Sequence, residues 1–351
     1  MTLSSISLRP LGPQDGPALA ALLAACPDTG SIGSTERFEI DPYQALMALQ
    51  KDPVGVVAET PGYAGLVGCG LIRFGQCQWE GLVRPSALLN TLVVHPDHRR
   101  QGVASRLAKW REQLAHQRQG PGGVLWAIIQ RNNTGSERTA FKWADQFLES
   151  RVATVPLRMR TASPPRSGHF EVRPVKPDEL ESVVEQLNQY YRDYNLYPPE
   201  TRGSLAAWLA ETPFDTPFRH YQIVADKAGS ILAGMGLSEN YRLRATLITH
   251  LPAGLRIMNR LFHVIPASGE LREAVLSRIW FAPGQIQAAR QLLERLRWEW
   301  RARCTSLMFS ADVRSPLVRL LSVWDRYGRE VAGIALSAPV PCSRDRLFYC
   351  G

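Results

Sequence analysis

The sequence predicts a mixed α/β fold with two domains in tandem, each a central mixed β-sheet flanked by helices. The chain has 351 residues, enough for two domains of ordinary size. Short apolar segments alternate along it with segments of amphipathic helical period. In addition, residues 6–26 resemble residues 170–191, since each segment runs from a strand through an Arg-Pro turn and an acidic residue into a helix.

This internal repeat has an offset of about 164 residues and indicates duplication of one domain. Between the two copies lies the stretch "RTASPPRSGH", residues 160–169, which is rich in Ser, Pro and Gly and shows no periodicity. That composition is typical of a linker. We therefore expect a first domain over residues 1–161, a linker over 162–169 and a second domain over 170–351.

The first domain is predicted to alternate strands and helices after its opening strand and helix. Asp41 is a suitable N-cap for a helix over 41–50, with Pro42 at the first helical position. The next predicted strands are a hairpin of 54–60 and 65–75, the strand 87–94, the strand 123–130 and a last strand near 152–160. The predicted helices are 99–117 and a short one after the turn 132–136.

The second domain is predicted to follow the same plan. Its expected elements are a hairpin over 221–239, a strand over 273–281, a helix over 283–304 and a strand over 305–311. One segment has no counterpart in the first domain: residues 251–265, predicted to form an additional helix that covers the sheet.

Composition limits the classes of function. The net charge of +9 comes almost entirely from arginine, with 36 Arg against 5 Lys. No basic run exceeds two residues and no aromatic residues interleave with a basic stripe, so nucleic acid is not an expected partner. None of the six cysteines has CxxC spacing, which argues against a zinc site and favours free thiols. No segment approaches the roughly 18 apolar residues of a membrane span, and we expect a cytoplasmic protein.

The stretch "LNTLVVHPDHRRQGVASRLAKW", residues 89–110, has the most informative pattern. A strand leads through a Pro-containing turn and two arginines to Gly102, and a helix follows at once. Glycine permits close approach of a ligand, and the first turn of a helix offers unpaired N–H groups at the positive end of its dipole. Such a junction binds phosphate groups.

Val94, Pro96, Arg99, Gly102 and Ala104 give the pattern VxPxxRxxGxA, which resembles the acyl-CoA pyrophosphate loop of the GNAT N-acetyltransferase superfamily. The resemblance implies two GNAT-like domains and acetyl-CoA as co-substrate, without a metal. It also implies that backbone groups of Leu92, Val93 and Val94 border the thioester, where an irregularity in the strand leaves an N–H free to polarise the carbonyl. The residues implied to hold the pyrophosphate are Arg99, Arg100, Gln101, Gly102, Val103 and Ala104. Asn133, or its neighbour Asn132, matches the family position that contacts the CoA arm.

The acid and base are less well defined. Many GNAT relatives have a tyrosine in the helix after the Asn, where it protonates the leaving thiolate, but this sequence has Phe141 and no tyrosine there. Glu80, just before the central strand, is the first candidate for the base that deprotonates the acceptor amine, and Glu36 is the second. A lone glutamate is more often a solvated surface group.

The second domain lacks the loop: Pro283 is present, but no Arg-x-x-Gly-x-Ala follows it. We therefore expect only the first domain to bind CoA. The expected function is transfer of an acyl group from acetyl-CoA to an amine of a small molecule or peptide. The alternatives are a non-catalytic acyl-CoA-binding protein, which the missing tyrosine favours, and a tRNA-dependent aminoacyl transferase, which the arginine excess favours.

Overall fold

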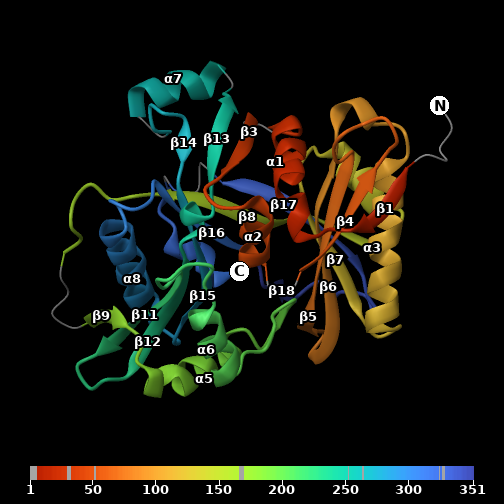
Figure 1. Cartoon of the computed structure of the whole chain (residues 1–351). Coiled ribbons are helices and arrows are strands. Elements are labelled where there is room, and N and C mark those ends of the chain that lie inside the picture. Colours follow the sequence, from red (N-terminus) through yellow and green to blue (C-terminus); the bar gives the residue numbers. More distant parts are fainter. Residues whose placement is uncertain are drawn as a thin grey trace.

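A twelve-stranded mixed sheet runs through the whole molecule (Figure 1). The computed structural model describes residues 6–29, 33–50, 53–165, 170–251, 253–262, 265–323, 325 and 329–351. In order across the sheet, the strands are β1 (Ser7–Pro10), β4 (Pro53–Glu59), β5 (Gly68–Trp79), β6 (Leu82–Val94), β7 (Val124–Gln130), β17 (Glu330–Ser337), β8 (Gln146–Arg158), β16 (Ser306–Asp312), β15 (Glu273–Phe281), β12 (Ile231–Ser238), β11 (Arg219–Asp226) and β9 (Phe170–Pro174). The predicted mixed α/β class is confirmed.

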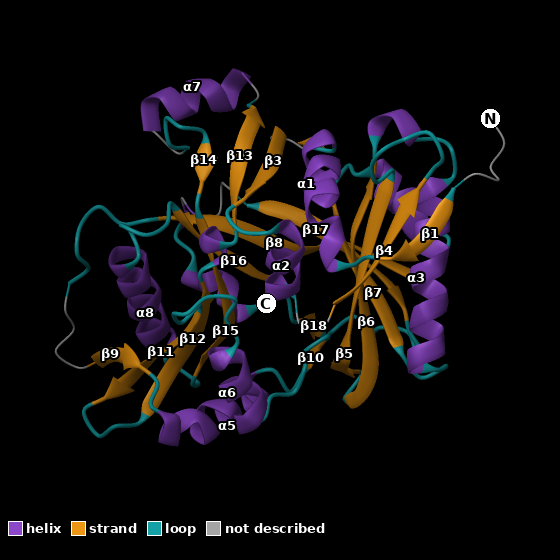
Figure 2. Cartoon of the chain, viewed as in Figure 1, coloured by secondary structure: helices purple, strands orange, loops and turns teal. Residues whose placement is uncertain are grey.

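Helices cover both faces of this sheet (Figure 2). The helices of the described residues are α1 (Gly16–Ala25), α2 (Pro42–Leu49), α3 (Val103–Gln119), α4 (Thr134–Ala140), α5 (Leu180–Tyr190), α6 (Arg202–Ala210), α7 (Ala253–Phe262) and α8 (Ile286–Glu299), and of these α7 alone is not on the large sheet. The predicted N-cap of α2 is confirmed, because the Asp41 carboxylate accepts a hydrogen bond from the backbone N–H of Gln44 at 3.0 Å. None of the described helices is both long and apolar enough to cross a membrane.

The internal repeat predicted from the sequence is confirmed by a pair of equivalent ion pairs. Arg9 at the end of β1 binds Asp15 with two hydrogen bonds of 2.8 and 2.7 Å, just before α1. Arg173 at the end of β9 binds Glu179 in the same way, at 2.7 and 2.5 Å, just before α5. Each pair is six residues apart in the chain and fixes the angle at which the strand enters the helix.

The two halves of the chain, residues 1–161 and 170–351, exchange strands β8 and β17. Strand β17 of the second half pairs antiparallel with β7 and with β8 of the first half. Strand β8 of the first half also pairs with β16 of the second half, from Ser306 opposite Arg158 to Asp312 opposite Val152. The hydrogen-bonded ladder is therefore continuous between the halves, although the sequence repeat divides them.

A second, four-stranded sheet also joins the halves. Its order is β14 (Glu270–Leu271), β13 (Arg244–His250), β3 (Gly33–Phe38) and β2 (Asp28–Thr29). Strands β3 and β13 come from different halves and pair antiparallel. The helix predicted over 251–265 is present as α7, but it lies beyond this small sheet and not on the large one (Figure 1). The reason is that β13 directs the chain away from the large sheet just before α7 begins.

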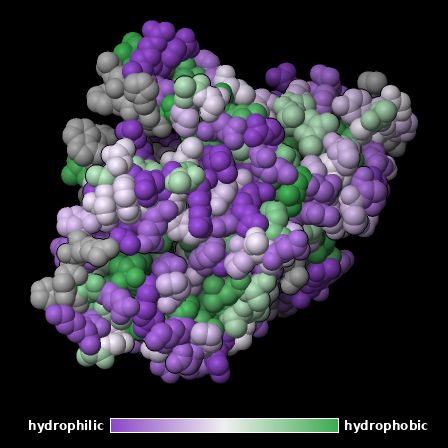
Figure 3. Space-filling model, turned by 60° about the vertical axis from the view of Figure 1, so that its left-hand side comes forward, coloured by the Kyte–Doolittle hydropathy of each residue, from purple (hydrophilic) through white to green (hydrophobic). Residues whose placement is uncertain are grey.

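Successive side chains of β5 point to opposite faces of the sheet and show which helices cover each face in the first half. Leu71 packs with Leu19 and Leu22 of α1, whereas Ile72 packs with Ala115 of α3. Helices α1 and α2 thus cover one face and α3 the other. The molecular surface seen in Figure 3 is mostly hydrophilic, with smaller hydrophobic areas between the polar side chains.

Candidate functional site

Strand β6 contains an irregularity of the kind that its resemblance to the GNAT superfamily implied. Residue Cys69 of β5 lies opposite Val93, but Leu71 lies opposite Asn90, so Thr91 and Leu92 together face the single residue Gly70. Thr91 has a φ of 46°, in the left-handed region. This is a β-bulge, which leaves the extra residue out of the ladder and turns its polar groups aside.

Arg111 of α3 braces the bulge from the opposite side of the sheet, a role that sequence reasoning missed. One guanidinium nitrogen donates to the carbonyl oxygens of Leu71 (3.1 Å) and Asn90 (2.8 Å), the residues at which the regular ladder resumes. The Arg111 side chain is 3% exposed, and this burial lowers its pKa to about 10. The available signal was an arginine four residues after Leu107, on the apolar face of the predicted helix.

Strands β6 and β7 diverge close to the bulge. They pair in parallel only between Ser86–Leu88 and Val124–Trp126. Beyond Leu88 no further pair joins them in the described residues, and Thr91 to Val94 are half-buried. Beyond Leu88 the two strands therefore form a wedge, and Leu92, Val93 and Val94 belong to the part of β6 that does not pair with β7.

The loop after β6 leads directly into α3. A single 3-10 turn, Pro96–His98, is followed by Arg100 and Gly102 with φ values of 62° and 79°. Gly102 is the N-cap of α3 and has no side chain to cap it, so the N–H groups of the first helical turn remain available to an anion. The predicted sequence of strand, glycine turn and helix start is thus present.

Two cations have positions that the sequence did not predict. The Arg99 side chain turns back to the strand, where Nε donates to the carbonyl oxygen of Val94 at 3.2 Å. The Lys142 ammonium, from the residues after α4, donates to the Ser105 hydroxyl at 2.9 Å. Lys142 therefore brings a positive charge to the first turn of α3.

The other residues implied for the CoA arm lie at the start of α4. Asn133 is the N-cap of that helix, and its side-chain oxygen accepts from the backbone N–H of Ser136 at 3.1 Å. Asn132 before it has a φ of 68°. Phe141, in place of the tyrosine of many GNAT proteins, is 61% exposed and packs on Phe147 with ring centroids 5.4 Å apart.

Comparison with known proteins agrees with this geometry. Residues 20–141 match the model of the acetyltransferase (GNAT) family. A tandem GNAT protein from the clavulanic acid biosynthesis pathway is similar over 96% of this chain and 100% of its own, with 13% identity and a TM-score of 0.59. Residues 20–141 thus match the GNAT family, and the chain as a whole shares the fold of a tandem GNAT protein. The family match in the first half supports acyl transfer as the class of reaction.

Two other solved structures share the fold over nearly the whole chain. N-myristoyltransferase of Saccharomyces cerevisiae, with bound myristoyl-CoA, is similar over 99% of this chain and 87% of its own, with 13% identity and a TM-score of 0.66. A GCN5-related N-acetyltransferase from Sphaerobacter thermophilus is similar over 96% and 97%, with 15% identity and a TM-score of 0.57. Among curated proteins no match was found.

The two glutamates expected as bases are both engaged with residues of the second half. Glu80 is in the turn between β5 and β6, roughly 30 Å along β6 from Leu92. Its carboxylate accepts hydrogen bonds from the Asn195 amide (2.7 Å) and the backbone N–H of Ser343 (3.1 Å), so it fixes the turn to the second half. Glu36 on β3 forms an ion pair with Arg244 on β13. Both placements favour structural roles.

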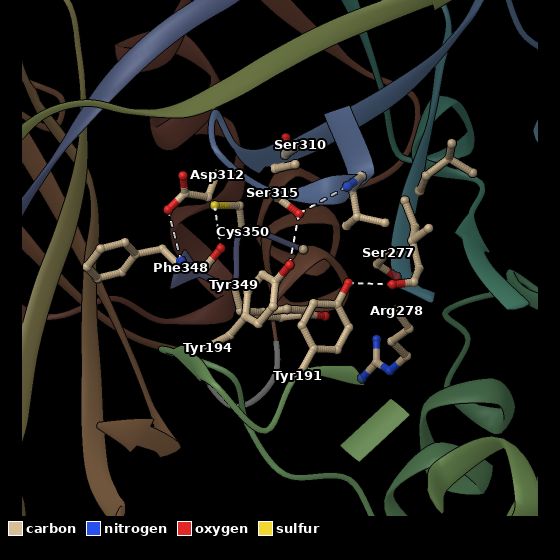
Figure 4. Close-up of a pocket in the computed structure, with 15 residues that line it drawn as sticks. Tyr191, Tyr194, Ser277, Arg278, Ser310, Asp312, Ser315, Phe348, Tyr349 and Cys350 are labelled. Atoms are coloured by element: carbon tan, nitrogen blue, oxygen red, sulfur yellow. Dashed lines mark hydrogen bonds between the residues drawn. The ribbon is translucent and has the colours of Figure 1, made fainter. Parts of the chain in front are cut away.

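The second half has a bulge and a wedge like those of the first half, but aromatic side chains occupy the wedge. Arg278 of β15 has a φ of 51° at a register shift like that of Thr91, and β15 pairs with β16 only over Glu273–Val275. In Figure 4, Tyr191 and Tyr194 point into the space between these strands. The Tyr191 hydroxyl donates to the Ile279 carbonyl, and the cavity that remains has a volume of about 10 Å³, room for one water molecule.

Among the described residues, no group of three or more His, Cys, Asp or Glu side chains could hold a metal ion. The candidate site of the first half is made up of backbone groups of β6, the N-terminus of α3 and the neighbouring cations.

Proposed function

We propose that the first half of this protein transfers an acetyl group from acetyl-CoA to the amine of a small molecule or peptide. The carrying observation is that the bulge at Thr91, the wedge between β6 and β7 and the glycine N-cap of α3 lie at one end of one strand. A thioester in the wedge would therefore lie at the bulge, and the pyrophosphate of the same CoA molecule would lie at the start of α3, where the chain that follows the bulge enters the helix.

In this proposal the loop binds the donor through charge and backbone dipoles. The pyrophosphate ligands are Arg99, Arg100, Gln101, Gly102, Val103 and Ala104, joined by Lys142. Leu92, Val93 and Val94 border the pantetheine arm, and Asn133 contacts it. Gly102 supports this assignment, because at a φ of 79° it leaves the first N–H groups of α3 accessible.

The chemical step is direct attack of the amine nitrogen on the thioester carbonyl. A C–N bond forms, the C–S bond breaks, and CoA leaves as a thiolate that takes up a proton. The N–H released by the bulge stabilises the oxyanion of the tetrahedral intermediate. The amine must lose a proton, and because Glu80 and Glu36 are engaged elsewhere, we assign proton transfer to water in the wedge.

A non-catalytic acyl-CoA-binding protein is the second candidate. The observation that favours it is Phe141, which offers no hydroxyl to protonate the leaving thiolate and is exposed in the structure. The two candidates share the donor site and differ only in turnover.

The test is calorimetric titration with acetyl-CoA, followed by a screen of amines for release of free CoA. We expect binding and release, and loss of binding in Arg99→Ala/Gly102→Glu. A matched control is Arg118→Ala/Gly120→Glu, which makes the same changes at the other end of α3, where Gly120 also has positive φ.

Absence of acetyl-CoA binding by the wild-type protein would refute both candidates. Binding without CoA release across the amine panel would identify the acyl-CoA-binding protein. Equal loss of binding in both double variants would show that the loop is not the site.

A further inference from the structure

One arginine of the first half, on the sheet face that α1 and α2 cover, has no counter-ion among the described residues. Arg73 of β5 is opposite Leu88 of β6, on the face covered by α1 and α2. Its side chain is partly buried, yet among the described residues no carboxylate forms an ion pair with it and no acceptor takes a hydrogen bond from it. Arginine remains protonated in proteins, so this charge is uncompensated.

Two residues of the second half approach Arg73, and one of them adds positive charge. Arg278, at the bulge of β15, is close enough to act on Arg73, as is the buried hydroxyl of Tyr349. Arg278 has its own partner, the Glu200 carboxylate at 2.8 Å, and it packs over the Trp208 ring. Burial lowers the pKa of Arg73, Tyr349 opposes this effect and Arg278 adds to it. Glu200 therefore neutralises one of two neighbouring arginines.

An acceptor atom without a donor lies on the same face, between Arg73 and the bulge. Asn90 precedes Thr91 on β6, and its amide nitrogen donates to Gln50 at 2.8 Å. The amide oxygen of Asn90 is buried and accepts no hydrogen bond. Because Asn90 is the diagonal neighbour of Arg73 across the β5–β6 ladder, their backbone positions are about 7–8 Å apart.

The Arg73 guanidinium can bind a carboxylate, and the Asn90 amide oxygen can accept a hydrogen bond from an amine. Together they suit a molecule that carries both groups. We propose that Arg73 binds the carboxylate of the acceptor and that the Asn90 amide oxygen accepts a hydrogen bond from its amine, next to the bulge. This inference rests on the proposed acyl transfer and specifies its acceptor as an amino acid or a short peptide with a free carboxylate. Arg278 contributes to the field that draws the anion in.

The test compares matched acceptors that differ only in charge. The probes are β-alanine, γ-aminobutyrate and glycylglycine, each against its C-terminal amide, with CoA release as the readout. The variants are Arg73→Gln, Arg73→Lys and, as a control, Arg118→Gln, which removes an equal charge from the opposite face of the sheet, where Arg118 packs over Phe74.

We expect the wild-type protein to prefer the acids. In Arg73→Gln, KM for the acids should rise about 10- to 100-fold, as loss of a charge-assisted hydrogen bond implies, while kcat/KM for the amides stays unchanged. Arg73→Lys should recover part of the loss. Preference for glycylglycine over the two amino acids would identify the peptide as the source of the carboxylate.

Failure of this inference differs from failure of the proposed function. CoA release that is equal for acids and amides, or a rise in KM for acetyl-CoA and not for the acceptor, would overturn the role of Arg73. If no probe releases CoA, the acyl transfer itself fails, and thermal denaturation then decides. Stabilisation of the wild-type protein, but not of Arg73→Gln, by γ-aminobutyrate would still support the anion site, and no stabilisation would overturn it.

Thermal denaturation without ligand separates binding from structure. Removal of an uncompensated, partly buried cation should leave the melting temperature unchanged or raise it. A large fall in the melting temperature of Arg73→Gln would mean that Arg73 has a structural partner.

Discussion

Replacement of Arg111 by methionine tests whether the bulge in β6 contributes to catalysis. The change removes two hydrogen bonds to the carbonyl oxygens of Leu71 and Asn90, worth about 1.5–3 kcal/mol each for a charged donor. It also removes a buried guanidinium whose pKa burial lowers to about 10, a cost of roughly 3 kcal/mol. These contributions largely offset each other, so the free energy of unfolding should fall by no more than about 3 kcal/mol.

The effect on turnover should be much larger. Without Arg111, the carbonyl oxygens of Leu71 and Asn90 lose the donor that they share beside the bulge, and the N–H that we propose is aimed at the thioester oxygen loses its position. Loss of one such donor lowers kcat about 100- to 1,000-fold. Acetyl-CoA affinity should stay within about threefold, because the pyrophosphate loop is unchanged.

Single-turnover kinetics and calorimetric titration measure these two quantities separately. Gly70→Ala should give a smaller effect in the same direction, since its Cβ would lie 3.1 Å from Cδ and Nε of Arg111. Arg118→Met, an exposed position on the same helix, is the control. A normal kcat in a folded Arg111→Met protein would refute the role of the bulge.

Three further predictions follow from the side-chain contacts. Lys142→Ala should weaken acetyl-CoA binding about 3- to 10-fold, with the larger effect at low salt, because the Lys142 ammonium lies at the first turn of α3. Titration with acetyl-CoA at two ionic strengths measures this effect. Equal affinities of the variant and the wild-type protein would place Lys142 outside the site. Glu80→Gln should lower the melting temperature and leave kcat within about twofold, whereas a 100-fold fall in kcat would restore Glu80 as the base. Arg173 lowers the pKa of Glu179 to about 2, so this pair stabilises the fold above the ordinary pKa of the carboxyl. About 1–2 kcal/mol of stability should be lost as the pH falls from 4.5 toward 2. Acid unfolding of Glu179→Gln should lack this loss.

Features set by neighbouring residues were predictable from the sequence. The hairpin of β4 and β5, the Asp41 cap of α2 and the turn from β6 into α3 each depend on a few consecutive residues whose conformational preferences are known. The repeat was visible for the same reason, because Arg9 and Asp15, like Arg173 and Glu179, act over six positions of chain. The glycine turn from β6 into α3 was therefore predictable from local chemistry.

Features set by distant residues were not predictable in this way. Strand β17 is mostly a continuous run of small and apolar residues, and nothing within it distinguishes β7 from β16 as a partner. Glu80 was a reasonable base on the sequence alone, but its partners Asn195 and Ser343 are more than a hundred positions away. The same holds for Arg73, whose neighbour Arg278 becomes visible only when the halves are assembled.

The strand exchange explains why the second half persists although its own wedge is filled. Ala335 of β17 packs in the same core as Ile72 and Leu89, so the sheet beneath the first half's site is completed by residues of the second. In return, β8 closes the second half's sheet at β16. A chain that ended after β8 would expose the edge of β7 beside the wedge and lose the buried contacts of β17. Arg278 and Tyr349 approach Arg73 across the same junction, so the second half contributes to the stability of the candidate site and to the charge around the proposed acceptor-binding arginine.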